Sequence, residues 1–362
     1  MAAAIDWATA ERVAKFVASR NQPDLPVGYS SIHRQFDELT ARAQELVEAH
    51  TGWTSVAGKA RARVVDRHDW TRANIASFRR MLRPLTDRVE ERIQPGLASA
   101  ISARVAGAEL GALLGWMSQR VLGQYDLLVL EDEDPHDQDI VYYVGPNIAA
   151  IERRFDFPSD EFRLWVALHE VTHRTQFTAK PWMREYFLSQ VSILTNLADP
   201  DPDRFFTAIG RAAEALRNKT NPFDGGLATL FASEEQRRAM DRVGGLMSLL
   251  EGHGDITMNR AGGAAIPDTQ RFHDTLHARR SEVKGAARVI QKLLGIEAKM
   301  LQYAQGEAFI EAIEAAGGPG LLDLAFDRAD NIPTIDEIRT PQLWLERVPA
   351  PGSWVATTPS SG

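Results

Sequence analysis

The chain has 362 residues, of which 44% are hydrophobic and 25% charged, a composition typical of a globular protein and not of a disordered or fibrous one. Its 49 acidic and 41 basic side chains give a net charge of −8, which disfavours the basic face that nucleic acids and anionic membranes require. The chain has no cysteine, which excludes disulfides, thiolate metal sites, iron–sulfur clusters and cysteine nucleophiles. Any transition metal must therefore be bound by imidazole and carboxylate groups.

The first residues, MAAAIDWATAER, lack the basic start and the apolar core of a secretory signal peptide. The longest apolar stretch, residues 110–119, is far shorter than the roughly 20 residues that span a bilayer. We therefore expect a cytoplasmic protein with neither a membrane nor a nucleic acid as partner.

Helical periodicity dominates the first 120 residues, which we expect to form an N-terminal helical region. Asp6 is a predicted N-cap, and Val13, Phe16 and Val17 fall on one face of the helix that follows. A second helix is predicted from Ser30, with its apolar side chains on one stripe. Residues from about 69 to 93 predict a third helix, which Pro84 should kink or split.

Three glycines, Gly107, Gly111 and Gly115, are spaced four residues apart in the apolar segment 101–122. Glycine costs about 1 kcal/mol in a helix interior, so a stripe of three indicates that another backbone passes very close. A ligand against that face is one interpretation, and close packing of a second helix is the favoured one.

Residues 121–348 are expected to form a second region, which carries the candidate functional residues, and residues 349–362 a disordered tail. Two short segments rich in β-branched and aromatic residues, 125–130 and 140–144, predict strands separated by an acidic turn. Further helices are predicted at about 159–177, 184–196, 202–216, 233–259, 269–294 and 296–316. The fold class is therefore mainly α with a small β element.

The segment LWVALHEVTHRTQF places His169 and His173 four residues apart inside an apolar helical run, with Glu170 beside the first of them. Side chains four residues apart face the same way on a helix, so both imidazoles can reach one ion. Zinc lowers the pKa of a bound water molecule toward about 7, and Glu170 is placed to act on that water as general base. The alternative is a pair of helix histidines with carboxylate partners.

A catalytic zinc site needs a third protein ligand, for which Glu251 in LLEGHGDITM is the best candidate. Asp255 lies four residues further on and would share its helix face, where it could accept the free N–H of a ligating histidine. The alternative is an acidic helix end that faces solvent. Tyr303 and His253 are the candidates for stabilising the charge that develops on the substrate oxygen.

His273 and His277 form a rival pair with the same spacing, but no glutamate lies between them. Three arginines nearby, at 271, 279 and 280, indicate a solvated basic face instead. We therefore do not expect this pair to bind metal.

The segments HEVTHRTQF, LLEGHGDITM, LLGIEAKMLQYAQGEAFI and NIPTIDEIRTPQLWLERV resemble the zincin-like metallopeptidase type 2 family, over nearly the whole chain. That family is also associated with biosynthesis of the deazaflavin redox cofactor. The resemblance implies a zincin-like fold in which His169, Glu170 and His173 take the HExxH roles. It also makes Glu251 and Asp255 similar to the ExxxD element of glutamate-type zincins. One departure is that Glu251 follows His173 by 78 positions, a longer gap than most such enzymes have.

Together these observations predict a zinc-dependent hydrolase, most simply a peptidase that acts on a peptide or another amide substrate. In that mechanism His169, His173 and Glu251 hold Zn²⁺, and Glu170 takes a proton from the attacking water. The alternative from another class is a non-catalytic protein that keeps the zincin scaffold and serves deazaflavin cofactor biosynthesis.

Overall fold

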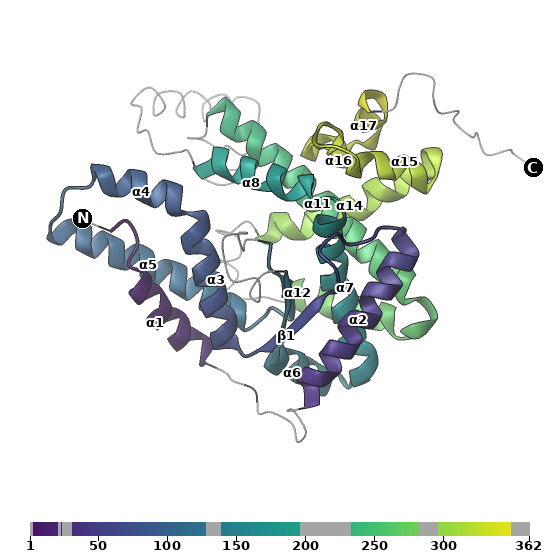
Figure 1. The fold of residues 1–362 in the computed structure, drawn as a ribbon, viewed down its shortest axis with the longest axis horizontal. Helices are drawn as coiled ribbons and strands as arrows, with labels where there is room; N and C mark the ends of the chain where they lie inside the picture. Colours follow the sequence, from purple (N-terminus) through teal and green to yellow (C-terminus); the bar gives the residue numbers. More distant parts are fainter. Residues whose placement is uncertain are drawn as a thin grey trace, which may run out of the picture. The chain divides into compact units, whose positions relative to one another are not determined.

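The computed structural model describes residues 3–20, 23, 31–127, 139–195, 233–281 and 296–348. The chain divides into two compact units: the first comprises Met1–Ala179 with Thr257–His273, and the second Lys180–Ile256 with Asp274–Gly362. The boundary predicted near residue 120 lies inside the first unit. The predicted tail, 349–362, and the predicted helix at 202–216 lie outside the described residues. The described part is mainly helical with one small sheet, as the sequence predicts (Figure 1).

The sheet of the first unit has three strands in the order β1-β3-β2, with β3 (Ile140–Val144) in the centre. β1 (Arg61–Val65) pairs with β3 in parallel, and β2 (Gly123–Tyr125) pairs with it antiparallel. The prediction of β3 is confirmed. β2 begins and ends earlier than the predicted segment 125–130, and β1 was not predicted at all.

Alternate residues of β3 face different layers of helices, as a pleated strand requires. Tyr142 belongs to a buried cluster with residues of α1, α3 and α5. Tyr143 faces the other way: its ring stacks on Phe36 with centroids 4.0 Å apart, and its hydroxyl lies 2.8 Å from the Thr40 hydroxyl. Burial is the main cause that raises the pKa of Tyr143, so the phenol stays neutral. α2 (Ile32–Thr51) supplies both of these partners and also packs on α7 (Ser159–Ala179).

α1 (Trp7–Ala18) and α5 (Leu97–Ser118) pack backbone against backbone. A Cβ added at Gly111 would lie 2.3 Å from the carbonyl oxygen of Ala10, and one added at Gly107 would lie 2.2 Å from that of Asp6. The predicted helix packing along the glycine stripe is therefore confirmed, as is the Asp6 N-cap, whose carboxylate accepts from the Thr9 N–H at 3.0 Å. The buried side chains of α1 are Ala10, Ala14 and Ala18.

The apolar face expected for α1 is wrong in part, because Phe16 is 60% exposed while Val13 and Val17 are half-buried. A contact this close leaves room only for alanine on α1, so the larger side chains lie at its margin or in solvent. The apolar pattern of the sequence identified a helix correctly and its packed face incorrectly.

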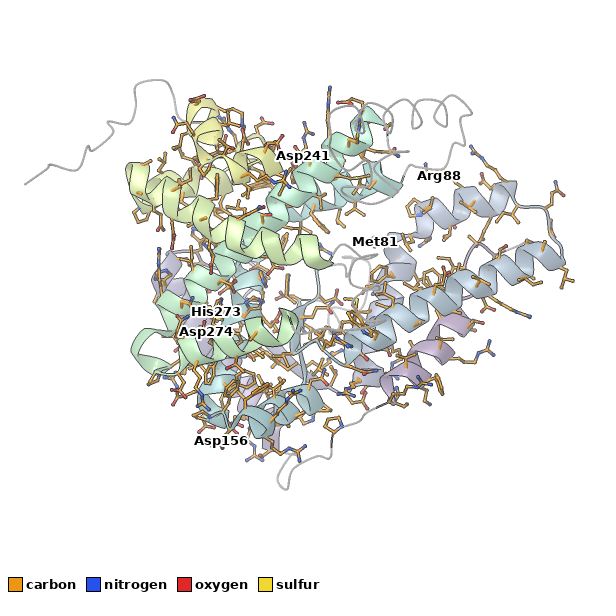
Figure 2. The ribbon with its side chains drawn as sticks, turned by 180° about the vertical axis from the view of Figure 1, so that it is seen from behind. Met81, Arg88, Asp156, Asp241, His273 and Asp274 are labelled. Carbon is orange, nitrogen blue, oxygen red and sulfur yellow. The ribbon has the colours of Figure 1, made fainter. Side chains whose placement is uncertain are left out.

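The predicted third helix is split, as the sequence predicts from Pro84. α3 (Arg67–Met81) ends one residue before Leu82, and α4 (Arg83–Arg92) begins with Pro84 in its first turn. Figure 2 labels Met81 at the end of α3 and Arg88 on α4. The break follows from the missing N–H of proline, which a first helical turn tolerates and a helix interior does not.

Among the described residues, α5 is long and apolar enough to cross a membrane, judged by length and composition alone. A core helix of a soluble protein passes the same test. In this chain the glycine face of α5 is covered by α1, whereas Leu97, Ile101 and Val105 are exposed. The absence of a membrane partner stays a prediction.

Two more helices, α6 and the start of α12, pack in the first unit. α6 (Gly145–Phe155) was not predicted and starts directly at the end of β3. Its Asn147 accepts from Arg67 Nε at 2.7 Å and donates to the Ser118 and Val121 carbonyls. α12 (Thr269–Ser281) was predicted at its start, and its Phe272 packs on Phe162 of α7 with centroids 5.3 Å apart.

The described residues of the second unit form helices and no strand. Its α-helices are α8 (Trp182–Thr195), α11 (Glu234–Gly262) up to Ile256, α14 (Ile296–Gly317), α15 (Pro319–Asp323), α16 (Ile335–Arg339) and α17 (Pro341–Arg347). α11 and α14 meet at glycines, since a Cβ added at Gly252 would lie 2.4 Å from the carbonyl carbon of Gly306. Asp241 of α11 accepts from the Ile335 N–H at 3.2 Å, and burial raises its pKa (Figure 2). The predicted helices at 184–196, 233–259 and 296–316 are confirmed.

Candidate metal centre

α7 carries the HExxH segment and is buried on nearly every side. Of its apolar side chains, Phe162, Leu164 and Leu168 are at most 2% exposed. Unusually for a core helix, several of its polar side chains are buried as well. They lie between the two histidines or shortly after them in sequence: Glu170, Thr172, Arg174, Thr175, Gln176 and Thr178. A helix that buries this many polar groups is positioned for chemistry as well as for packing.

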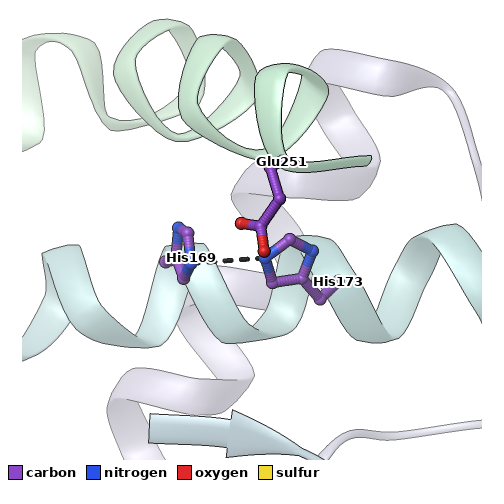
Figure 3. A group of neighbouring side chains, drawn as sticks. All are labelled: His169, His173 and Glu251. Atoms are coloured by element: carbon purple, nitrogen blue, oxygen red, sulfur yellow. Dashed lines mark hydrogen bonds between the residues drawn. The ribbon is translucent and has the colours of Figure 1, made fainter. Parts of the chain in front are cut away.

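His169 and His173 lie one turn apart on α7 and turn their rings toward each other (Figure 3). The two Nε2 atoms are 3.2 Å apart. Two nitrogen ligands at the usual zinc–nitrogen distance of about 2.0–2.1 Å in a tetrahedron would be separated by about 3.3 Å. The spacing of the two imidazole nitrogens therefore fits a shared metal ion.

Glu251 lies on α11 and is 8% exposed. The last turns of this helix belong to the first unit, where a Cβ at Gly262 would be 3.3 Å from Leu168 Cδ1 of α7. Glu251 itself belongs to the second unit, and its part in a metal site with His169 and His173 stays a prediction. Two imidazoles and one carboxylate are the donors of a catalytic zinc site.

Asp255 follows Glu251 by one turn on α11 and is 9% exposed. The two carboxylates share a helix face, as the sequence predicts from their spacing. The role of Asp255 as acceptor for a ligating histidine stays a prediction.

Glu170 is 7% exposed, and its side chain lies against strand β2. A Cβ added at Gly123 would be 2.5 Å from Glu170 Cγ and 2.7 Å from Oε1. Gly123 therefore leaves the space that the carboxylate occupies. The sequence gives no sign of this, because the two residues are distant in the chain and meet only through the antiparallel pairing of β2 with β3.

Gln176 is a further residue of the site that the sequence interpretation missed. Its Oε1 lies 3.0 Å from His173 Nδ1, and the side chain is fully buried. The signal was present, since residues three apart on a helix are neighbours and Gln176 follows His173 by three.

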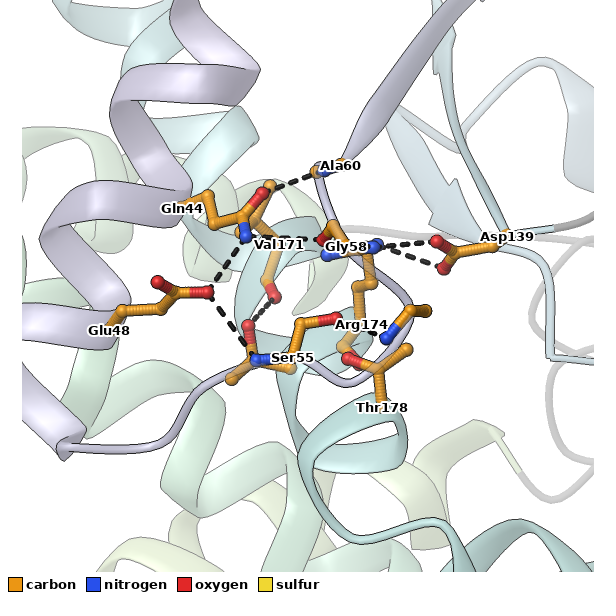
Figure 4. A network of polar contacts seen from close by, with 11 residues as sticks. Gln44, Glu48, Ser55, Gly58, Ala60, Asp139, Val171, Arg174 and Thr178 are labelled. Atoms are coloured by element: carbon orange, nitrogen blue, oxygen red, sulfur yellow. Dashed lines mark hydrogen bonds and ion pairs between the residues drawn. The ribbon is translucent and has the colours of Figure 1, made fainter.

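Arg174 anchors α7 to the sheet and to the loop before β1 (Figure 4). This fully buried guanidinium donates from Nε and Nη2 to the two carboxylate oxygens of Asp139, at 2.9 and 2.6 Å. It also donates to the Gly58 carbonyl at 2.9 Å. Gln44 of α2 fixes the same loop by accepting from the Ala60 N–H at 2.7 Å. The helix that carries the histidines is thereby held on two sides.

The remaining candidates are placed as follows. His253 is buried on α11, with its ring centroid 4.9 Å from that of Phe326. Tyr303 falls in α14 at a position whose side chain lies outside the described residues, and the same holds for His277 in α12. His273 is half-buried on α12. The proposed role of Tyr303 stays a prediction.

The family model of zincin-like metallopeptidases matches residues 5–345 of the chain. No curated protein gives a significant match. Among solved structures, a protein from Chloroflexus aurantiacus described as a putative hydrolase with a novel fold is similar, with 30% sequence identity and a TM-score of 0.70. The similarity covers 95% of this chain and 98% of that one. Because the family model spans almost the entire sequence, including both histidines and Glu251, the chain belongs to the zincin-like metallopeptidase family.

Proposed function

We propose that this chain is a zinc-dependent hydrolase that cleaves amide bonds, with peptides as the leading substrate class. The observation that carries the proposal is the convergence of two Nε2 atoms, 3.2 Å apart on a buried helix, with Glu170 between the two histidines in sequence. Membership of the zincin-like family and similarity to a protein described as a hydrolase support it.

In this proposal His169, His173 and Glu251 hold the metal ion. When bound, zinc supplies a Lewis acid that makes water nucleophilic at neutral pH. The donor set favours zinc, because neutral imidazoles together with a single carboxylate match its preferred ligands. His169 and His173 are half-buried on α7, which lowers the effective dielectric around them and strengthens their electrostatic interactions.

Glu170 acts as the general base. Its carboxylate takes a proton from the attacking water and later delivers that proton to the departing amine nitrogen. Its contact with Gly123 holds the carboxylate on one side of α7, where the strand limits its rotamers. A fixed carboxylate is required because proton transfer depends on a hydrogen-bonding distance to the reacting water.

The first test is metal content, measured by elemental analysis of untagged protein purified without chelators. We expect about one zinc per chain, and none in the His169→Ala, His173→Ala double variant. A wild-type protein that neither retains zinc nor takes it up on titration would refute the metal site and with it the hydrolase.

The second test is a peptide-library screen with Glu170→Gln as the matched control. This variant should keep its zinc and lose hydrolysis by about 10²–10⁴-fold, because the amide cannot accept the proton from water. A zinc-loaded wild type that is no more active on the library than Glu170→Gln would instead favour the non-catalytic scaffold.

A further inference from the structure

We propose that Gln176 is a positioning residue that fixes the imidazole of His173 for metal binding and thereby tightens the site's hold on its ion. This inference rests on the proposed function, since it assigns His173 as a metal ligand. It adds a residue that the HExxH pattern does not contain.

The geometry carries the proposal. Gln176 Oε1 lies 3.0 Å from His173 Nδ1. An amide oxygen can only accept a hydrogen bond, so the ring hydrogen of His173 resides on Nδ1. The lone pair of the ring is then on Nε2, the atom that lies 3.2 Å from Nε2 of His169. The hydrogen bond therefore selects both the tautomer and the ring orientation that a metal needs.

The three buried threonines nearby on α7 behave differently. The hydroxyls of Thr172, Thr175 and Thr178 donate to the carbonyl four residues earlier in the helix, at 2.7–2.9 Å. These bonds satisfy the threonines locally and leave the histidines untouched. Gln176, by contrast, places its acceptor on a ring nitrogen of His173, so among these four residues it is the one coupled to the metal ligand.

Burial makes this hydrogen bond consequential. Gln176 is fully buried, and in a low-dielectric interior a hydrogen bond is stronger and its loss more costly than in water. Removing the partner of a ligating histidine commonly weakens metal affinity by about 10–100-fold. We expect an effect of that size here.

The experiment measures the zinc dissociation constant of the full chain at one fixed pH, by competition with a chromophoric chelator. Three variants are compared: Gln176→Leu, which removes the acceptor at similar volume; Gln176→Glu, which keeps an acceptor; and Thr175→Val, a matched buried control on the same helix. We expect Gln176→Leu to bind zinc about 10–100-fold more weakly, with Gln176→Glu and Thr175→Val within about threefold of wild type.

Nitrogen NMR of the histidine rings in the metal-free protein supplies a second readout. The wild type should show His173 with its hydrogen on Nδ1, and this signature should be lost in Gln176→Leu. This measurement on the wild type tests the hydrogen bond even where the leucine variant does not fold.

Three results would overturn the inference: an Nε2–H tautomer of His173 in the wild type, an unchanged zinc affinity in Gln176→Leu, or an equal loss in the leucine and glutamate variants, which would indicate a packing role. A wild type that binds no zinc yet shows the Nδ1–H tautomer would refute the proposed function. In that case the hydrogen bond itself would stand as a structural contact.

Discussion

Two helices of the first unit carry regularly spaced residues, and the spacing means different things in each. α5 repeats glycine every four residues, and α7 repeats histidine at the same interval. In α5 the repeat faces the backbone of α1, where a Cβ at Gly111 would lie 2.3 Å from a carbonyl oxygen. In α7 the repeat brings two ring nitrogens to 3.2 Å.

The difference lies in what surrounds each repeat. The buried residues of α5 are small or apolar, with a single buried serine. The glycine repeat of α5 is therefore explained by the close approach of α1 alone. Most of the residues between and after the histidines of α7 are polar and buried, and buried polar groups need hydrogen-bond partners. A four-residue spacing thus indicates packing when its neighbours are small, and chemistry when its neighbours are buried donors and acceptors.

The largest difference between the two helices is at Arg174, because α7 contains a buried ion pair with Asp139 and α5 has no buried ion pair among the described residues. The change Asp139→Asn removes the charge that faces the guanidinium and keeps a side chain that tolerates the positive φ of residue 139. A buried charge without its counter-charge costs about 3 kcal/mol, and we expect the free energy of unfolding to fall by about this amount.

Urea denaturation measures this effect, with the exposed Asp87→Asn on α4 as the matched control. The control should change the free energy of unfolding by less than about 0.5 kcal/mol. Equal stabilities for the two variants would show that the Arg174–Asp139 pair does not hold α7 in place.

The corresponding change in α5 is Gly111→Val. Its side chain would collide with the Ala10 backbone, which cannot rotate away as a side chain could. We expect a loss of about 2–3 kcal/mol in the free energy of unfolding, because α1 must shift outward. The neighbouring Ala112→Val, on the exposed side of the same helix, should cost less than about 1 kcal/mol. If Ala112→Val lowered the free energy of unfolding by as much, the low helix propensity of valine and not the close packing of α1 would explain the loss in Gly111→Val.

Sequence patterns predicted the elements that depend on local chemistry. Asp6 caps α1, Pro84 divides α3 from α4, and the apolar run around His169 forms α7. What the sequence did not predict depends on contacts between distant segments. β1 alternates arginine with small and branched residues, and it becomes a strand through its parallel pairing with β3. α6 opens with Gly-Pro, which is typical of a turn but is equally tolerated at the start of a helix.

The site divides in the same way. The relation of His169 to His173 follows from helical geometry and could be predicted from spacing alone. Gln176 follows from the same rule, because a residue three positions after His173 is its neighbour on a helix. The contact of Glu170 with Gly123 could not, because it requires the register of β2 against β3 and the packing of α7 on β2.

That contact gives the change with the smallest expected effect on stability. In Gly123→Ala the new methyl group would press on the carboxylate of Glu170, whose atoms can move because they end a flexible side chain. We expect the free energy of unfolding and the zinc affinity to change little, and kcat to fall by about tenfold with KM unchanged, since a displaced base transfers protons less efficiently. Gly96→Ala, where nothing lies within 4 Å, is the matched control. An equal kcat in both variants would mean that Glu170 keeps its working position without the space at Gly123. The two glycines would then differ in kind: Gly111 of α5 is indispensable because a rigid backbone opposes it, whereas the Glu170 side chain opposite Gly123 can turn aside.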